Sequence, residues 1–128
     1  MPKKSVCFGV VLLAAGCANL FAPGRPVILP VVNIEAPSTV APGAGFSVTF
    51  KVGSGGCTRF VRGEATKTST TLTFTAHGRD SSGPNTSCPT DIRYDEVVET
   101  LTLPISDPFT IVARQPDGSQ TTKVVRVQ

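Results

Sequence analysis

The sequence has no tryptophan, one tyrosine and one histidine, and only 6% of its residues are aromatic. A Ser–His–Asp hydrolase needs a base within hydrogen-bond reach of its nucleophile, and only His77 could be that base. The sequence also lacks a G-x-S-x-G elbow, a glycine-rich phosphate loop and paired metal ligands. We therefore predict no catalytic residues, no metal site and no cofactor, and we expect the protein not to be an enzyme.

A long apolar segment is also missing from the N-terminal region. The apolar core at residues 6–15 is about ten residues long, whereas a transmembrane helix needs about twenty. A basic start that includes Lys3 and Lys4 precedes this core, and a run of small residues follows it. A basic start, a short apolar core and small residues are typical of a signal peptide for export.

The end of this segment, Leu13-Ala14-Ala15-Gly16-Cys17, resembles the lipobox of bacterial lipoproteins. The usual pattern has Leu three places before the cysteine, where this chain has Ala14, and Leu13 stands one place earlier. The resemblance implies cleavage before Cys17 and a diacylglycerol on its sulfur, which would attach the protein to a membrane of the bacterial cell envelope. Ala18 is not the Asp of inner-membrane retention, so the resemblance favours the outer membrane where one exists.

Two other interpretations of the N-terminal segment stay open. It could be an ordinary secretory signal with a cysteine at its cleavage site, or a buried apolar helix of a cytosolic protein. On the lipoprotein interpretation, residues 1–16 are the signal peptide, residues 17–26 form a short lipidated tether, and residues 27–128 form one domain.

Excess positive charge is almost absent from the predicted mature chain. The formal charge of +3 includes Lys3 and Lys4, and their removal leaves ten Lys and Arg against nine Asp and Glu. A nucleic-acid surface would need a clustered basic face, so we predict no nucleic-acid partner. The expected partners are the membrane, through the lipid on Cys17, and another envelope protein.

Four cysteines are present, and two of them remain for the fold. Cys7 leaves with the signal and Cys17 takes the lipid, so Cys57 and Cys88 meet the oxidising compartment of an exported protein. We predict a Cys57–Cys88 disulfide that closes a loop of about thirty residues. Two free thiols are the alternative.

Glycine and proline are frequent, with 12 and 11 residues, and no helical periodicity follows the signal segment. Alternating apolar and polar residues are clearest at 46–52, and the sequence of Gln115–Gly118 is typical of a hairpin turn. The predicted strands lie at residues 27–36, 46–52, 57–65, 70–77, 97–103, 109–114 and 120–127. Gly63 could mark a bulge in the third of them.

The segment APSTVAPGAGFSVTFKV, residues 36–52, resembles the first hairpin of bacterial immunoglobulin-like domains. The resemblance implies an all-β, immunoglobulin-like antiparallel β-sandwich of about seven strands after the signal peptide. The Cys–Trp–Cys core of antibody domains is absent, so the resemblance is to immunoglobulin-like sandwiches in general.

A polar loop at residues 78–91 is the predicted interaction site, with Arg79, Asp80 and Asn85 as its candidate residues. Two charged stripes also stand out, and we expect complementary cross-strand pairs to account for both. The basic stripe consists of Arg59 and Arg62 with Lys51 on a neighbouring strand, and the acidic one of Asp95, Glu96 and Glu99.

These features predict a lipid-anchored envelope protein whose small β-sandwich acts as a binding module or as a structural accessory. The alternative is an envelope lipoprotein that binds a small ligand or a metal. Against that alternative, the chain lacks the aromatic and soft-ligand clusters that such sites use.

Overall fold

The computed structural model describes residues 24–102 and 104–128. The predicted signal peptide, Cys17 and residues 18–23 of the tether therefore lie outside the described residues, as does Leu103. Within the described ranges the chain forms nine strands and no helix, so no helix there could cross a membrane. The predicted all-β fold is confirmed.

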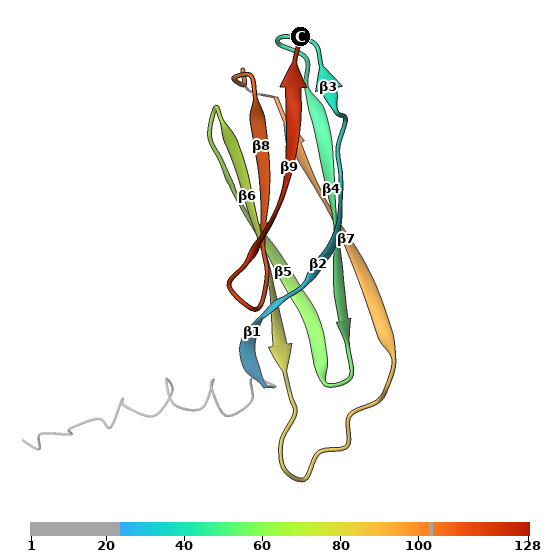
Figure 1. The fold of residues 1–128 in the computed structure, drawn as a ribbon. Helices are drawn as coiled ribbons and strands as arrows, with labels where there is room; N and C mark the ends of the chain where they lie inside the picture. Colours follow the sequence, from blue (N-terminus) through green and yellow to red (C-terminus); the bar gives the residue numbers. More distant parts are fainter. Residues whose placement is uncertain (1–23, 103) are drawn as a thin grey trace, which may run out of the picture.

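Figure 1 shows the nine strands, coloured in the order in which they follow one another along the chain. They are β1 (Arg25–Leu29), β2 (Val31–Glu35), β3 (Thr39–Val40), β4 (Phe46–Gly55), β5 (Thr58–Lys67), β6 (Thr71–Asp80), β7 (Ile92–Leu101), β8 (Phe109–Arg114) and β9 (Gln120–Val127).

Two sheets pack face to face as a sandwich. The large sheet has the order β1-β6-β8-β9-β3, with β5 on the other side of β6, and the small sheet has the order β2-β4-β7. The pairs β6–β8 and β3–β9 run parallel, and the other pairs run antiparallel. The strand β6 is the centre of the large sheet, because β5 covers one side of it while β1 and β8 share the other.

The single strand predicted at residues 27–36 is two strands in different sheets. β1 pairs with β6 in the large sheet, and β2 pairs with β4 in the small sheet, with only Pro30 between them. Proline has no backbone N–H to give to a ladder, so it suits the point where the chain leaves one sheet for the other. The Pro30 carbonyl still accepts a hydrogen bond from the N–H of Gly53 at 3.0 Å.

Aromatic pairs join the two sheets through the core. Phe50 of β4 stacks on Phe74 of β6, with ring centroids 4.1 Å apart and planes 6° apart. Phe46 of β4 meets Phe109 of β8 edge to face at 6.1 Å. These four side chains therefore point into the core, as the alternation of apolar and polar residues predicted. Fifteen buried apolar residues form the core: Leu29, Val31, Ile34, Val40, Val48, Phe50, Val52, Leu72, Phe74, Ala76, Leu101, Phe109, Ile111, Ala113 and Val125.

The predicted loop at residues 78–91 is shorter at its start, because β6 continues to Asp80 and the loop begins at Ser81. Gly78 is a strand residue here for reasons of space. A Cβ added to Gly78 would lie 2.6 Å from the carbonyl oxygen of Arg59 and 2.7 Å from the side chain of Leu29. The glycine thus permits close packing in the middle of the strand, and it does not mark a turn.

The strand predicted to start at Val97 begins earlier, at Ile92. β7 is an edge strand of the small sheet, and charged side chains on its inner side reach β5. Arg93 donates to the carbonyl oxygen of Thr58 at 3.1 Å, and Lys67 contacts Glu99 at 3.1 Å. Inward-pointing charges are one way in which edge strands avoid pairing with other chains.

The N-terminal end of β1 and the loop of residues 81–91 lie at the same end of the sandwich, and the C-terminus lies at the opposite end (Figure 1). We call this the disulfide end, because the predicted disulfide is also there. It contains Gly24, the Cys57–Cys88 pair and the loop of residues 81–91.

Candidate binding surfaces

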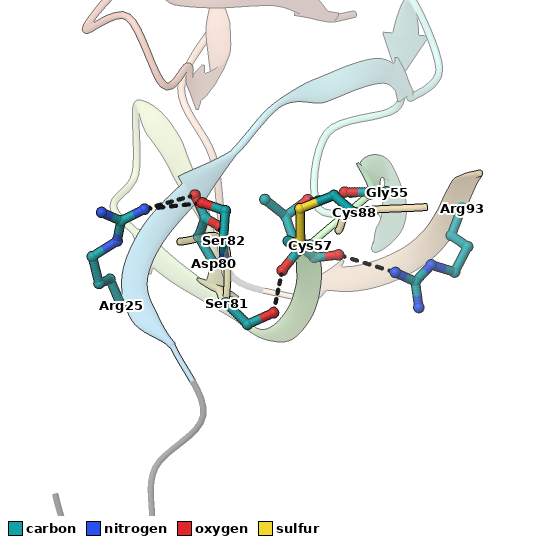
Figure 2. The surroundings of a disulfide bond; sticks show 9 residues. Arg25, Gly55, Cys57, Asp80, Ser81, Ser82, Cys88 and Arg93 are labelled. Atoms are coloured by element: carbon teal, nitrogen blue, oxygen red, sulfur yellow. Dashed lines mark hydrogen bonds and ion pairs between the residues drawn. A yellow bond between two sulfur atoms is a disulfide. The ribbon is translucent and has the colours of Figure 1, made fainter. Parts of the chain in front are cut away.

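The predicted disulfide is present and attaches the 81–91 loop to the sandwich (Figure 2). Cys57 and Cys88 are 31 residues apart in sequence, and their Cα atoms are 5.1 Å apart. Backbone contacts reinforce the attachment, because the N–H of Ser81 donates to the carbonyl of Cys57 at 3.0 Å and the N–H of Gly56 donates to that of Asp91 at 3.3 Å. The loop is therefore fixed at both ends and in its second half.

The three residues predicted for the interaction loop are separated by the structure. Arg79 and Asp80 belong to β6, and only Asn85 lies in the exposed loop. Asp80 has a structural role, since it accepts hydrogen bonds from the N–H of Ser82 at 2.8 Å and from Arg25 at 3.3 Å (Figure 2). The hydrogen bonds from Ser82, with the Arg25 guanidinium, hold the pKa of Asp80 below its ordinary value.

An apolar groove lies on the outer face of the small sheet, near the disulfide end. Its walls are Pro30 and Val32 on one side and Ile92 and Tyr94 on the other, with Gly53 as part of the floor. The floor of the groove is deep at Gly53 because this residue has no side chain. An added Cβ would lie 3.3 Å from Val32 and 3.8 Å from both Pro30 and Tyr94. The groove has a volume of about 350 Å³, and its lining consists of Pro30, Val32, Gly53, Ser54, Gly55, Thr58, Asp91, Ile92 and Tyr94.

Large apolar side chains are exposed along this face. Ile92 is 71% exposed, Val98 59%, Tyr94 55% and Val32 52%. The sequence contained a signal for them, since Ile92 and Tyr94 alternate with Arg93 and Asp95. It was missed because this alternation places the apolar residues on the outer face of an edge strand and the charged ones inward.

Lys51 lies beside the apolar groove and opposes an acidic residue, as expected. Its ammonium lies 4.7 Å from the centre of the Tyr94 ring, and its register partner on β7 is Glu96. The predicted stripe of Lys51 with Arg59 and Arg62 is wrong, however, because β4 and β5 belong to different sheets. The hairpin between them turns the chain from the small sheet into the large one.

The outer face of the large sheet has a second, polar cavity of about 220 Å³. Its lining consists of Ile28, Glu64, Thr66, Thr73, Thr75, His77 and Arg114. The Nε2 atom of His77 lies 3.2 Å from a carboxylate oxygen of Glu64, and the same oxygen lies 3.5 Å from Arg62. Among the described residues, Glu64 is the side-chain hydrogen-bond partner of His77.

The charges on this face do not all follow the expected complementary pairing. Arg59 of β5 has Arg79 of β6 as its partner across the antiparallel ladder. The bulge in β5 lies between Phe60 and Arg62, earlier than the predicted position at Gly63. It leaves Val61 54% exposed while Phe60 packs against the core.

Among the residues that the structure describes, no three His, Cys, Asp or Glu side chains come together as a metal site would require. No protein-family model, curated protein or solved structure matches the chain.

Proposed function

We propose that this chain is a lipid-anchored cell-envelope protein whose β-sandwich binds another envelope protein through the apolar groove. The anchor is supported by the resemblance of Leu13–Cys17 to a lipobox. Two acyl chains on one thiol bury many CH₂ groups, each worth about 0.8 kcal/mol, so they hold a protein at a membrane without a transmembrane helix.

The observation that carries the binding proposal is the exposed apolar face of the small sheet. Ile92, Tyr94 and Val98 are all more than half exposed, and they project from one strand on one side. Ile92 and Tyr94 line the apolar groove together with Val32, and apolar grooves of this kind are typical of interaction sites. The aromatic ring of Tyr94 and its stacked Lys51 add the amphipathic character that is enriched at protein interfaces.

The face of the small sheet is a better candidate than its free edge. Strand addition needs unpaired backbone groups along an edge strand. At the edge of β7, Lys67 donates to the carbonyl oxygen of Thr100 at 3.0 Å, and the charged inner side of the strand is turned toward β5. A partner that lies on the face needs none of these backbone groups, and it covers the apolar side chains directly.

The anchor and the binding face are tested separately. Replacement of Cys17 by Ser should move the protein from the salt-washed membrane fraction to the soluble envelope fraction, and the intact mass of the parent should show cleavage before Cys17 with acylation. A Cys17→Ser protein that still sediments with membranes after a high-salt wash, or a mature parent without acyl mass, contradicts the anchor.

For the binding face, Ile92→Glu and Tyr94→Ser should abolish co-purification of an envelope protein with the acylated parent. Val124→Glu is the matched control, because Val124 is 49% exposed but belongs to the large sheet. Alteration of residues 83–87 tests the predicted loop in the same assay. If the partner still co-purifies with both groove variants and is lost with the loop variant, the groove proposal is contradicted and the loop becomes the binding site.

A further inference from the structure

Two arginines occupy directly opposed positions on the outer face of the large sheet. Arg59 and Arg79 are register partners in the β5–β6 ladder. Both point outward, because their neighbours Phe60 and Gly78 face the core. Directly opposed residues in an antiparallel pair have Cβ atoms about 5 Å apart, and like charges at such positions destabilise the sheet. The pair therefore has a cost that the fold does not explain.

The carboxylates around this pair are engaged elsewhere. Asp80 pairs with Arg25 at 3.3 Å, Asp91 with Arg93 at 3.2 Å, and Glu64 with both Arg62 and His77. Within residues 24–102 and 104–128, neither Arg59 nor Arg79 has a carboxylate within 4 Å. Two positive charges thus remain without a protein counter-ion at the disulfide end.

The position of Arg79 relates this charge to the N-terminal segment. Its Nη1 atom lies 3.5 Å from the carbonyl oxygen of Gly24, to which it donates a long hydrogen bond. Gly24 follows Cys17 by seven residues, which span at most about 25 Å when fully extended. If Cys17 carries the lipid, as the proposed function holds, this end of the sandwich lies within that distance of the membrane surface.

We propose that Arg59 and Arg79 bind the phosphate groups of anionic lipid headgroups in the membrane that holds the anchor. The planar guanidinium group donates two parallel hydrogen bonds to a phosphate. Two adjacent guanidinium groups also supply positive charge that neutralises the negative charge of the headgroup. A lipid anchor combined with basic residues is a stable arrangement for membrane attachment. It also orients the body, with the large sheet's arginines toward the headgroups and the apolar groove of the small sheet accessible to a partner.

The test uses the full chain with Cys17→Ser, so that binding does not depend on acylation. Co-sedimentation is measured with vesicles of phosphatidylglycerol and phosphatidylcholine, and with vesicles of phosphatidylcholine alone. We expect binding to the anionic vesicles that weakens as salt is raised. The double variant Arg59→Gln/Arg79→Gln should lower the partition coefficient on the order of twenty-fold, because each basic residue near an anionic surface contributes about a five-fold factor.

The matched control is Lys51→Gln/Lys123→Gln, which removes the same charge from elsewhere. Lys51 lies on the small sheet, and Lys123 has Ile111 as its register partner and so lies on the opposite side of the large sheet from the arginines. This control should keep its affinity within about two-fold of the parent. Segment 1–16 is identical in every protein compared, so a difference between the variants comes from the substituted residues.

A second measurement separates binding from folding. Because the two arginines repel each other, Arg59→Gln should leave the thermal midpoint unchanged or raise it, while it weakens vesicle binding. Equal losses in the arginine double variant and in the lysine control would overturn the proposal, as would tight binding of inorganic phosphate without a preference for anionic vesicles. Fractionation of the acylated parent tests the anchor independently, so failure of one proposal is distinguishable from failure of the other.

Discussion

The side-chain amide of Gln115 hydrogen-bonds to both backbone groups of Val31. The N–H of Val31 donates to Gln115 Oε1 at 3.1 Å, and Gln115 Nε2 donates to the carbonyl oxygen of Val31 at 2.9 Å. The Gln115 amide thus makes the two hydrogen bonds that a neighbouring strand would otherwise make at this edge of β2. Gln115 begins the turn between β8 and β9, so one amide joins the edge of the small sheet to the large sheet.

Replacement of Gln115 by Ala should lower the free energy of unfolding by about 2 kcal/mol, because two part-buried backbone groups lose their partners. The measurement is urea denaturation followed by far-ultraviolet circular dichroism. Gln120→Ala is the matched control, since Gln120 is exposed and close in the chain. An equal loss of stability in the two variants would show that the amide pairing contributes nothing.

The disulfide should stabilise the fold mainly by restricting the unfolded chain. Cross-linking residues 31 positions apart contributes about 3–4 kcal/mol in the chain-entropy account. Cys57→Ser/Cys88→Ser should therefore lower the urea midpoint markedly, and reduction of the parent should reproduce that midpoint. A parent that is insensitive to reductant under conditions in which its two thiols become titratable would contradict this prediction.

Gly63 is a position where the core has no room for a side chain. A Cβ added there would lie 2.6 Å from Cε2 of Phe74 and 3.3 Å from Cγ1 of Val97, and Phe74 cannot retreat because it stacks on Phe50. Gly63→Ala should destabilise the protein by about 1–3 kcal/mol. Gly83→Ala provides the comparison, because its nearest contact would be Thr86 Oγ1 at 3.4 Å, and its stability should stay within about 0.5 kcal/mol of the parent.

Stability should fall in acid, partly through Asp107. The backbone N–H of Val127, followed by the Arg126 guanidinium, holds the pKa of Asp107 below its ordinary value of 3.8. The unfolded chain therefore binds a proton at a pH where the folded chain does not. The stabilisation is fully present above the ordinary pKa and is lost as the pH falls through the lowered, native pKa.

Urea midpoints measured between about pH 6 and about pH 2.5 test this dependence. Asp107→Asn should be less stable than the parent at neutral pH, and the difference should shrink as the pH falls through the native pKa. Asp80 and Asp117 have pKa values shifted in the same direction, so the variant should keep part of the acid sensitivity. A difference between parent and variant that stays constant across the whole range would contradict the assignment.

Local patterns predicted the C-terminal hairpin of the fold well. The bounds of β8 and β9 agree with the predicted strands, and the intervening turn has the expected contact between the N–H of Gly118 and the carbonyl of Gln115 at 3.1 Å. Gly118 also has the positive φ, +85°, that such a turn requires. These features depend on residues that are neighbours in sequence, so the sequence alone is sufficient to predict them. The Cys57–Cys88 disulfide was predictable for a different reason, because the lipobox resemblance assigned Cys7 and Cys17 to the signal peptide and the lipid and left one possible pair.

The features that were missed depend on which strands meet in space. Nothing in residues 27–36 shows that Pro30 separates strands of two sheets, because the partners β6 and β4 are distant in sequence. The opposition of Arg59 and Arg79 likewise depends on the register of the part of β5 that precedes the bulge at Phe60–Arg62, and a shift of one residue would turn one arginine to the other face. The apolar groove needs three separate segments, so no local pattern contains it.

The place of β1 in the ladder has a mechanical consequence. Its five register pairs with β6, from Arg25 with Asp80 to Leu29 with Ala76, lie along the direction of the strand, and the chain then crosses at Pro30 into the other sheet. A tensile force applied at Gly24 along the axis of β1 loads these rungs together in shear, whereas a perpendicular force would peel them one after another. Under the proposed function, this geometry would keep the sandwich on its tether when a bound partner is pulled away from the membrane.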